Sequence, residues 1–306
     1  MPDFGIFIVL GVVAMAGALI YIKKRKDDDD DDDNYVPITP SEEENMDTKF
    51  ALVVGINKYA TPGMDLSGCV NDATNMKEFL VECCGFKAAN VKMLTDSQAI
   101  KKNILSHLNW LVSGRKAGDE LFYYHSGHGT QVLDVSGDEA DQLDEVLVTH
   151  DFDWNNPLLD DDIAKIFNKL PSGAFLSMIC DTCHSGSMSR DIDRNIAMPK
   201  EMAEKMKDKV VKKRKFGSKA TQNHVMLSGC RDDQTSSETI IAGKKQGVLT
   251  YTFVNECRKS AQSWNNIHKN VVYVLSSAGW PQEPVLSGPD NLKNRVVLGR
   301  KLGEVC

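Results

Sequence analysis

The chain has 306 residues, of which 42% are hydrophobic and 26% are charged, as in ordinary soluble globular proteins. Its net charge of −7 owes much to the aspartate run at 27–33, so the charge gives no indication of a nucleic-acid partner. The eight cysteines do not include two CxxC segments that could pair with each other. This argues against a disulfide framework or a zinc site and favours buried or reactive thiols in a reducing compartment.

The amino terminus is unlike the rest of the chain. Residues 4–22 are uncharged and strongly apolar, and as a helix they would extend roughly 29 Å, about the thickness of a bilayer core. Four basic residues follow at 23–26, and such residues tend to stay in the cytosol. We therefore expect residues 1–26 to form a single-pass membrane anchor with its basic flank, and the catalytic domain to be cytosolic. A secretory signal peptide is the alternative, but it normally begins with basic residues.

Residues 27–48 combine the aspartate run with Pro37, Pro40 and the acidic residues 42–44. Such a segment buries too little apolar surface to fold, so we expect an acidic, disordered stalk. Its aspartates offer ligands to calcium, although a solvated spacer is the simpler interpretation.

Strand and helix patterns alternate from Lys49 onwards. Buried strands are expected at 50–56, 91–94, 121–125, 146–149 and 174–180, and helices at 70–83, at 100–112 and around Ile163, Ile166, Phe167 and Leu170. A lysine- and arginine-rich linker at 190–222 follows, and then a strand at 224–227, a helix at 248–258 and a strand at 270–275. The alternation predicts an α/β fold with a mostly parallel sheet covered by helices on both faces.

Two of these strands end in chemically distinctive segments. The strand at 121–125 runs into HSGHG (125–129), and the strand at 174–180 runs into DTCHSG (181–186). Ligand crevices in open α/β sheets form at the carboxyl ends of parallel strands. If the two strands are neighbours, His128 and Cys183 face each other across such a crevice, as a Cys-His dyad for acyl transfer requires.

This pair of motifs resembles the two catalytic motifs of metacaspases, the caspase-like cysteine peptidases of non-animal organisms. Three further segments fit the same family in the same order: LSGCVNDA (66–73), SGCRDDQTSSE (228–238) and QEPVLSG (282–288). The resemblance covers roughly 49–300 and is to the type I-like arrangement without a long linker. It implies a caspase-like three-layer sandwich, preceded here by one transmembrane helix, with a large catalytic part at 49–189 and a small part at 223–306.

Cys183 is the expected nucleophile, and His128 raises its thiolate fraction and later protonates the leaving amine. The backbone amides of Gly129 and Cys183 are the expected oxyanion hole, since glycine permits close approach. His125 and His128, together with Cys183 or His184, suggest a zinc site as an alternative to roles for His125 and His184 in the loops, but zinc hydrolases usually show HExxH or separate ligand pairs. We expect them to hold the loops by hydrogen bonding.

Asp181 lies two residues before the nucleophile, where its charge raises the pKa of the thiol unless a cation of the substrate neutralises it. The family resemblance implies that Asp181 and Asp72 line the S1 pocket, together with Cys69 and Ser126. Two acids there predict cleavage after arginine or lysine. The alternative for Asp72 is an ordinary residue at the start of a helix.

The resemblance also implies a calcium site, for which Asp144, Asp160 and Asp161 supply hard oxygen ligands. A fourth family aspartate is replaced by Arg190, and Asp191 follows one place later as a weaker candidate. A favourable charge on the first turn of a helix is the alternative role of Asp160–Asp162.

Taken together, these features predict a membrane-anchored cysteine endopeptidase that cleaves proteins and peptides after basic residues. Calcium is the expected activator, with no organic cofactor, and the enzyme is expected to be a monomer. Self-cleavage is expected between 188 and 222, and a cut within 23–26 would release the domain. The alternative from another class is a catalytically silent caspase-like module that binds a partner at the membrane.

Overall fold

The computed structural model describes residues 48–133, 143–184, 223–229, 237–241 and 243–306. Within these ranges, no helix has the length and apolar character needed to cross a bilayer. The predicted anchor (4–22), its basic flank (23–26), almost all of the acidic stalk (27–48) and the basic linker (190–222) lie outside them, and each stays a prediction.

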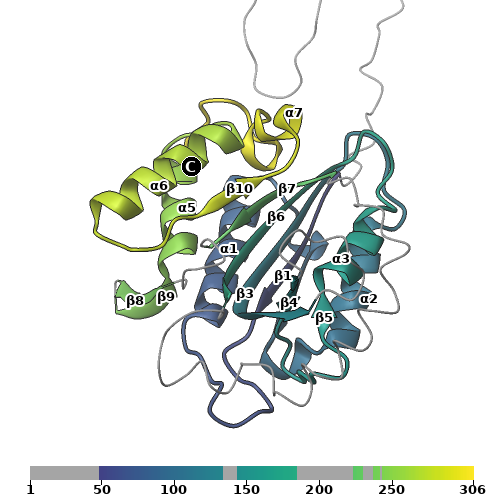
Figure 1. Cartoon of the computed structure of the whole chain (residues 1–306). Helices are drawn as coiled ribbons and strands as arrows, with labels where there is room; N and C mark the ends of the chain where they lie inside the picture. The colour runs from purple at the N-terminus through teal and green to yellow at the C-terminus, as the bar shows by residue number, and fades with distance from the viewer. Residues whose placement is uncertain (1–47, 134–142, 185–222, 230–236, 242) are drawn as a thin grey trace, which may run out of the picture. The chain divides into compact units, whose positions relative to one another are not determined.

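The fold is built on one sheet in the strand order β10-β7-β6-β3-β1-β2, with β4 paired to β3 and β5 paired to β4 (Figure 1). All pairs among β7, β6, β3, β1 and β2 are parallel, whereas β10, β4 and β5 pair in antiparallel fashion. The strands are β1 (Lys49–Gly55), β2 (Val91–Thr95), β3 (Glu120–Leu133), β4 (Leu143–Leu147), β5 (Leu158–Leu159), β6 (Phe175–His184), β7 (Val225–Ser228) and β10 (Val285–Ser287). The predicted mostly parallel sheet is confirmed.

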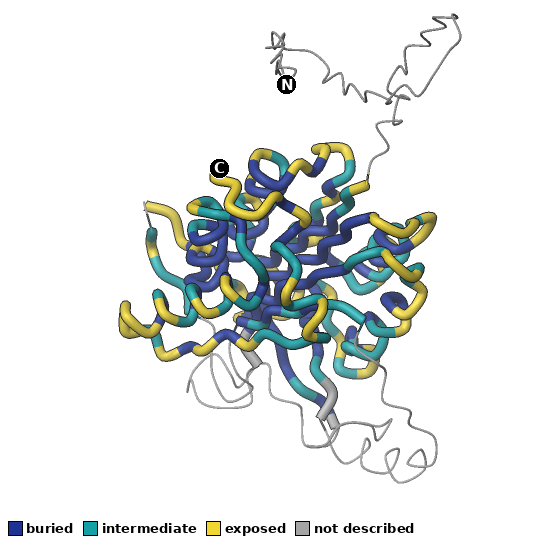
Figure 2. Tube along the Cα trace, turned by 90° about the horizontal axis from the view of Figure 1, so that it is seen from above, coloured by how far each residue is buried: buried dark blue, intermediate teal, exposed yellow. Residues whose placement is uncertain are grey.

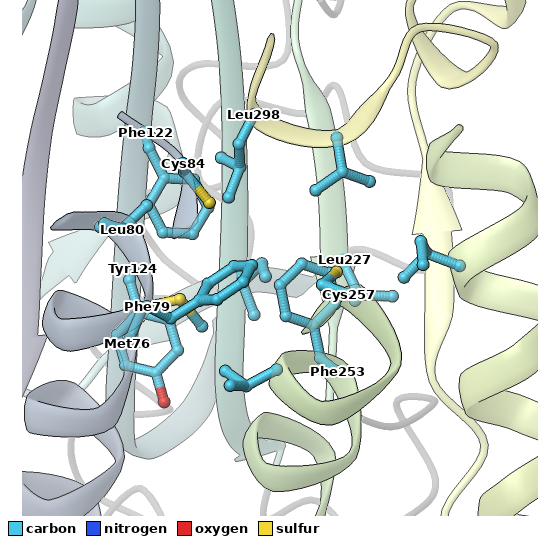
Figure 3. Close-up of a cluster of buried hydrophobic side chains, with 14 of the residues drawn as sticks. Met76, Phe79, Leu80, Cys84, Phe122, Tyr124, Leu227, Phe253, Cys257 and Leu298 are labelled. Carbon is cyan, nitrogen blue, oxygen red and sulfur yellow. The ribbon is translucent and has the colours of Figure 1, made fainter. Parts of the chain in front are cut away.

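Helices cover both faces of the sheet, so the predicted α/β layering is also confirmed (Figure 1). One face packs on α1 (Cys69–Cys83), α5 (Val248–Lys259) and α6 (Trp264–Ser277), and the other packs on α2 (Lys101–Val112) and α3 (Asp160–Phe167). Successive residues of a strand point to opposite faces, and both are apolar here: Tyr124 belongs to the first core and Tyr123 to the second. Figure 2 shows the strands as the buried interior, and Figure 3 shows the first core between α1, β3 and α5.

Close packing of α1 on the sheet depends on Gly55, the last residue of β1. A Cβ atom at this position would lie 2.4 Å from the carbonyl oxygen of Cys69 and 2.7 Å from the Cβ of Ala73. The first turn of α1 therefore approaches the carboxyl end of the sheet more closely than any other residue type would permit. That approach brings Cys69 and Asp72 to the edge where the sequence predicts the site.

A small hairpin, β8 (Glu238–Ile241) and β9 (Lys244–Gly247), leads directly into α5. It was not predicted, although Gly243, which has a φ of +78°, lies in the short break between its strands and is a hairpin signal. The remaining elements are α7 (Asp290–Lys293) and the 3-10 helices Ala88–Asn90, Asp96–Gln98 and Val297–Gly299.

The predicted strand at 270–275 is wrong, because this segment lies within α6. Its run of valines suggested a strand, but Trp264, Ile267, Val271 and Leu275 repeat at helical spacing and form the buried side of α6. The helix begins after Ser263, whose hydroxyl accepts a hydrogen bond from the backbone N–H of Asn266. Tertiary burial of that apolar stripe outweighs the strand propensity of the valines.

The expectation that the cysteines are buried or reactive thiols is wrong for one pair. Cys83, at the end of α1, is bonded to Cys306, which is 223 residues away in the sequence. Sequence spacing cannot reveal a pair that only the fold brings together. Of the other cysteines whose side chains the structure describes, Cys69, Cys84, Cys180 and Cys257 are buried free thiols, as predicted.

Candidate functional site

The candidate site lies where β3 and β6 extend beyond their neighbours. Pairing of β3 with β1 ends at Ser126, and pairing of β6 with β7 ends at Cys180, but β3 and β6 stay paired as far as Gly129 and His184. The predicted strand ends at 125 and 180 are therefore too early. The extension is a two-stranded projection at the carboxyl edge of the sheet, beyond the ends of the neighbouring strands.

His128 and Cys183 occupy directly paired positions on this projection. Gly129, the other residue expected to contribute to the oxyanion hole, is one position further along β3 and pairs with Leu147 of β4. The register thus brings the backbones of the proposed nucleophile, base and oxyanion residues together, as a dyad at adjacent strand ends requires. Only the backbone of Cys183 is described.

The ring of His128 is held by the loop between β1 and α1 (residues 56–68). Its Nε2 atom donates a hydrogen bond to the carbonyl oxygen of Met64 at 2.8 Å, because a carbonyl only accepts. The Tyr59 hydroxyl accepts a hydrogen bond from the backbone N–H of His128 at 2.9 Å, and the two rings lie 5.0 Å apart. In the neutral imidazole, Nδ1 is consequently the nitrogen that carries the lone pair.

Asp72 and Asp181 form a buried acid pair beside this projection, with 1% and 6% of their surfaces exposed. Ser126 links them, since its Cα pairs with that of Asp181 and its hydroxyl donates to Asp72 Oδ2 at 3.3 Å. The backbone N–H of Gly247 donates to both carboxylate oxygens of Asp72, at 2.9 and 3.0 Å. A Cβ atom at Gly247 would lie 2.5 Å from Asp181 Oδ2 and 2.9 Å from Asp72 Oδ2, so Gly247 lies directly against both acids.

Asp181 is bound by the first turn of α5. The hydroxyl and backbone N–H of Thr250 donate to its Oδ2 atom, at 2.6 and 3.2 Å, and the hydroxyl of Tyr124 lies 2.6 Å from that of Thr250. Burial, and then the negative charge of Asp181, raise the pKa of Asp72 to about 8. The pair is therefore a site that a cation would stabilise in its ionised form.

Cys69 completes the predicted S1 group. It begins α1, one turn before Asp72, and its backbone N–H donates to the side-chain oxygen of Asn57. Its thiol is buried and donates to Oε1 of Glu238 at 3.5 Å, and burial raises the pKa of this thiol. The structure thus places Asp72, Asp181, Ser126 and Cys69 in one cluster.

Several residues around this site were missed from the sequence. Tyr59 and Met64 contact His128, whereas Gly247, Thr250 and Glu238 contact the acid pair or Cys69. Met64 and Gly247 act through backbone atoms, and the type of a residue does not predict such a role. The three acting through side chains carry no spacing signal, although Glu238 ends the family-like segment SGCRDDQTSSE (228–238).

The histidines considered for zinc are not arranged as ligands in the described residues. His125 is fully buried, its Nδ1 atom lies 3.1 Å from the hydroxyl of Tyr123, and burial lowers its pKa to about 3. No group of three or more histidine, cysteine or acidic side chains within the described ranges is arranged to hold a metal ion. For His184 only the backbone is described.

The predicted calcium residues are brought to the same region of the fold. Val146 of β4 pairs with Leu159 of β5 in antiparallel fashion. Asp144 lies two residues before Val146 and Asp161 lies two residues after Leu159, so the two lie on the same side of this pair, on neighbouring segments. Asp160 and Asp161 begin α3, where Lys165 lies 3.4 Å from Asp161. Carboxylate oxygens are suitable donors for calcium, and an incoming ion would compete with this lysine. Asp191 lies outside the described residues, and the side chain of Asp144 is not described.

Comparison with solved structures identifies the fold. A crystal structure of a Geobacter sulfurreducens protein matches 84% of this chain and 100% of its own, with a TM-score of 0.61 and 24% identity. The crystal structure of Caspase-1 from Spodoptera frugiperda matches 83% of this chain and 90% of its own, with a TM-score of 0.54 and 13% identity. The caspase-like fold is thereby shown.

Sequence comparison identifies the family. Residues 49–191 match the family model described as "Metacaspase, peptidase C14 domain". Metacaspase-1 of Candida glabrata is 31% identical over 78% of this chain and 71% of its own length, and Metacaspase-1A of Aspergillus niger is 33% identical over 78% and 69%. The chain therefore belongs to the metacaspase family of cysteine peptidases, which are hydrolases acting on peptide bonds.

Proposed function

We propose that this protein is an endopeptidase that cleaves after arginine or lysine, with Cys183 as nucleophile and His128 as general acid and base. The observation that carries the specificity is the buried pair of Asp72 and Asp181, whose carboxylates both lie against Gly247. A guanidinium or ammonium group compensates two carboxylates in a desolvated site, whereas an acidic side chain there is repelled.

The proposed reaction begins when His128 takes the proton of the Cys183 thiol. The thiolate sulfur then bonds to the scissile carbonyl carbon, and the backbone amides of Gly129 and Cys183 stabilise the oxyanion. The C–N bond breaks as the imidazolium protonates the leaving amine. Water, deprotonated by His128, then attacks the thioester and releases the acid and the thiol. With its own proton on Nε2, which donates to Met64, His128 accepts and returns the transferred proton at Nδ1.

Calcium is proposed as the activator, held by Asp144, Asp160 and Asp161, where it would stabilise the β4–α3 region by neutralising the acids. Anchoring through residues 4–22, a cytosolic catalytic domain, self-cleavage within 188–222 and a monomeric state belong to the same proposal. Their support is the composition of those segments together with the family to which the chain belongs.

The test compares three otherwise identical fluorogenic peptides with arginine, citrulline or aspartate at P1, using the full-length chain in detergent with millimolar calcium or with chelator. We expect cleavage of the arginine peptide, which is lost in Cys183→Ala and strongly reduced in Asp72→Asn. Calcium dependence that disappears in Asp160→Asn/Asp161→Asn would support the metal site. Preference for aspartate, or no cleavage of any peptide after processing, contradicts the proposal, and the second result favours a silent binding module.

A further inference from the structure

The β8–β9 hairpin is fixed on the amino-terminal half of α1, the helix that carries Asp72. The side-chain amide of Asn71 donates to the carbonyl oxygen of Lys245 at 2.8 Å, and that of Asn75 donates to the side chain of Gln246. The N–H of Gly247 completes the attachment at Asp72. Side chains on this hairpin therefore have defined positions relative to the acid pair.

Glu238 lies at the solvent side of this attachment. It pairs directly with Gly247 across the hairpin, the residue that lies against both acids. Its Oε1 atom accepts hydrogen bonds from the backbone N–H of Gly68, at 3.2 Å, and from the thiol of Cys69. The negative charge of Glu238 also raises the pKa of Asp72, after burial and the charge of Asp181, so the three carboxylates interact.

The same carboxylate already holds a cation from its own hairpin. Lys245 Nζ lies 3.5 Å from Glu238 Oε2, and these side chains are 47% and 21% exposed. An ion pair this exposed contributes little to stability, so another cation can replace the lysine. Three carboxylates thus extend from the buried acid pair to the surface, and an exchangeable ammonium group occupies the outermost one.

We propose that Glu238 is a third specificity-determining acid for the basic P1 side chain, and that Lys245 competes with that side chain for it. This inference rests on the proposed basic specificity and adds a mechanism that limits substrate affinity in the free enzyme. Substrate binding exchanges one cation for another at Glu238, so removal of Lys245 strengthens binding and removal of Glu238 weakens it.

The experiment measures kcat and KM of the full-length chain on the arginine and citrulline peptides, which differ in charge but hardly in shape. We expect Lys245→Met to lower KM for the arginine peptide up to about fivefold, the range that an exposed ion pair allows, with kcat unchanged. Glu238→Gln raises that KM by a similar factor. In the double variant, Lys245→Met has no further effect, and neither variant changes KM for citrulline.

Lys244→Met is the matched control, because Lys244 is the neighbouring exposed lysine of β9 and its side chain alternates to the other side of the strand. The inference is overturned if the wild type prefers arginine to citrulline but KM is the same in Glu238→Gln, or if Lys244→Met reproduces the effect of Lys245→Met. A wild type that cleaves both peptides equally overturns the proposed basic specificity itself.

Discussion

Asp72 combines almost complete burial with an adjacent carboxylate, and this determines its charge before substrate arrives. Its pKa of about 8 lies well above the ordinary value of 3.8 for aspartate, because burial disfavours the charged form and Asp181 adds repulsion. Below about pH 8 the carboxyl group is mostly protonated in the free enzyme. A basic P1 side chain must ionise it on binding, which costs free energy that increases as the pH falls.

This protonation predicts a pH-dependent preference for basic substrates. The ratio of kcat/KM for the arginine peptide to that for the citrulline peptide should rise between pH 6 and 8, approaching tenfold per unit, and level off above about pH 8. Using the ratio removes the titration of the catalytic pair, which both peptides share. In Asp72→Asn the ratio should be low and independent of pH. A wild-type ratio that is constant over this range contradicts the assignment.

Loop 56–68 shows how an element without regular structure positions a catalytic group. Its Tyr59 hydroxyl and Met64 carbonyl both bind His128, and the backbone N–H of Asn57 is itself fixed by Asp96 at 2.8 Å. The loop begins directly after Gly55, on which the first turn of α1 packs closely. The loop thus connects the packed helix α1 to the groups that orient the imidazole of His128.

Tyr59→Phe tests this role, because it removes the acceptor for a buried backbone N–H and leaves the ring in place. We expect kcat to fall about tenfold, the effect of one lost hydrogen bond of roughly 1.4 kcal/mol, while KM for the arginine peptide hardly changes. Steady-state kinetics well below the melting temperature separate this from instability. Tyr273→Phe is the control, since Tyr273 is 72% exposed. An unchanged kcat in Tyr59→Phe would show that the contact does not position His128.

The elements differ in how far sequence could predict them. The parallel strands and α1, α2 and α5 have clear apolar periodicity, and the glycine-rich motifs marked where the chemistry would lie. The valines of α6 favoured a strand that the fold does not form. The partners of His128 and Asp72 are partly backbone groups, which the sequence does not reveal. The family resemblance identified the acids, but only the register of β3 with β6 and the contact of Gly247 bring them together.

At the scale of the whole catalytic domain, the carboxyl-terminal segment is held against the first strand and the first helix of the fold. Lys49 donates hydrogen bonds to the carbonyl oxygens of Cys84 and Leu298, and the buried side chain of Arg300 donates to the carbonyl oxygen of Cys257. The Cys83–Cys306 disulfide adds a covalent link at the same place. The last residues of the small part are therefore structural elements of the large part.

Cys306→Ser should lower the free energy of unfolding by about 2–5 kcal/mol under oxidising conditions, because the bond restricts a very long loop in the unfolded chain. Urea denaturation with and without a reducing agent is the measurement. Reduction should bring the wild type to the stability of the variant and leave the variant unchanged. Val305→Ser, at a neighbouring position that is 69% exposed, should leave the redox effect intact. Equal stability of the oxidised and reduced wild type would show that the hydrogen bonds of Lys49 and Arg300 hold this segment without the disulfide.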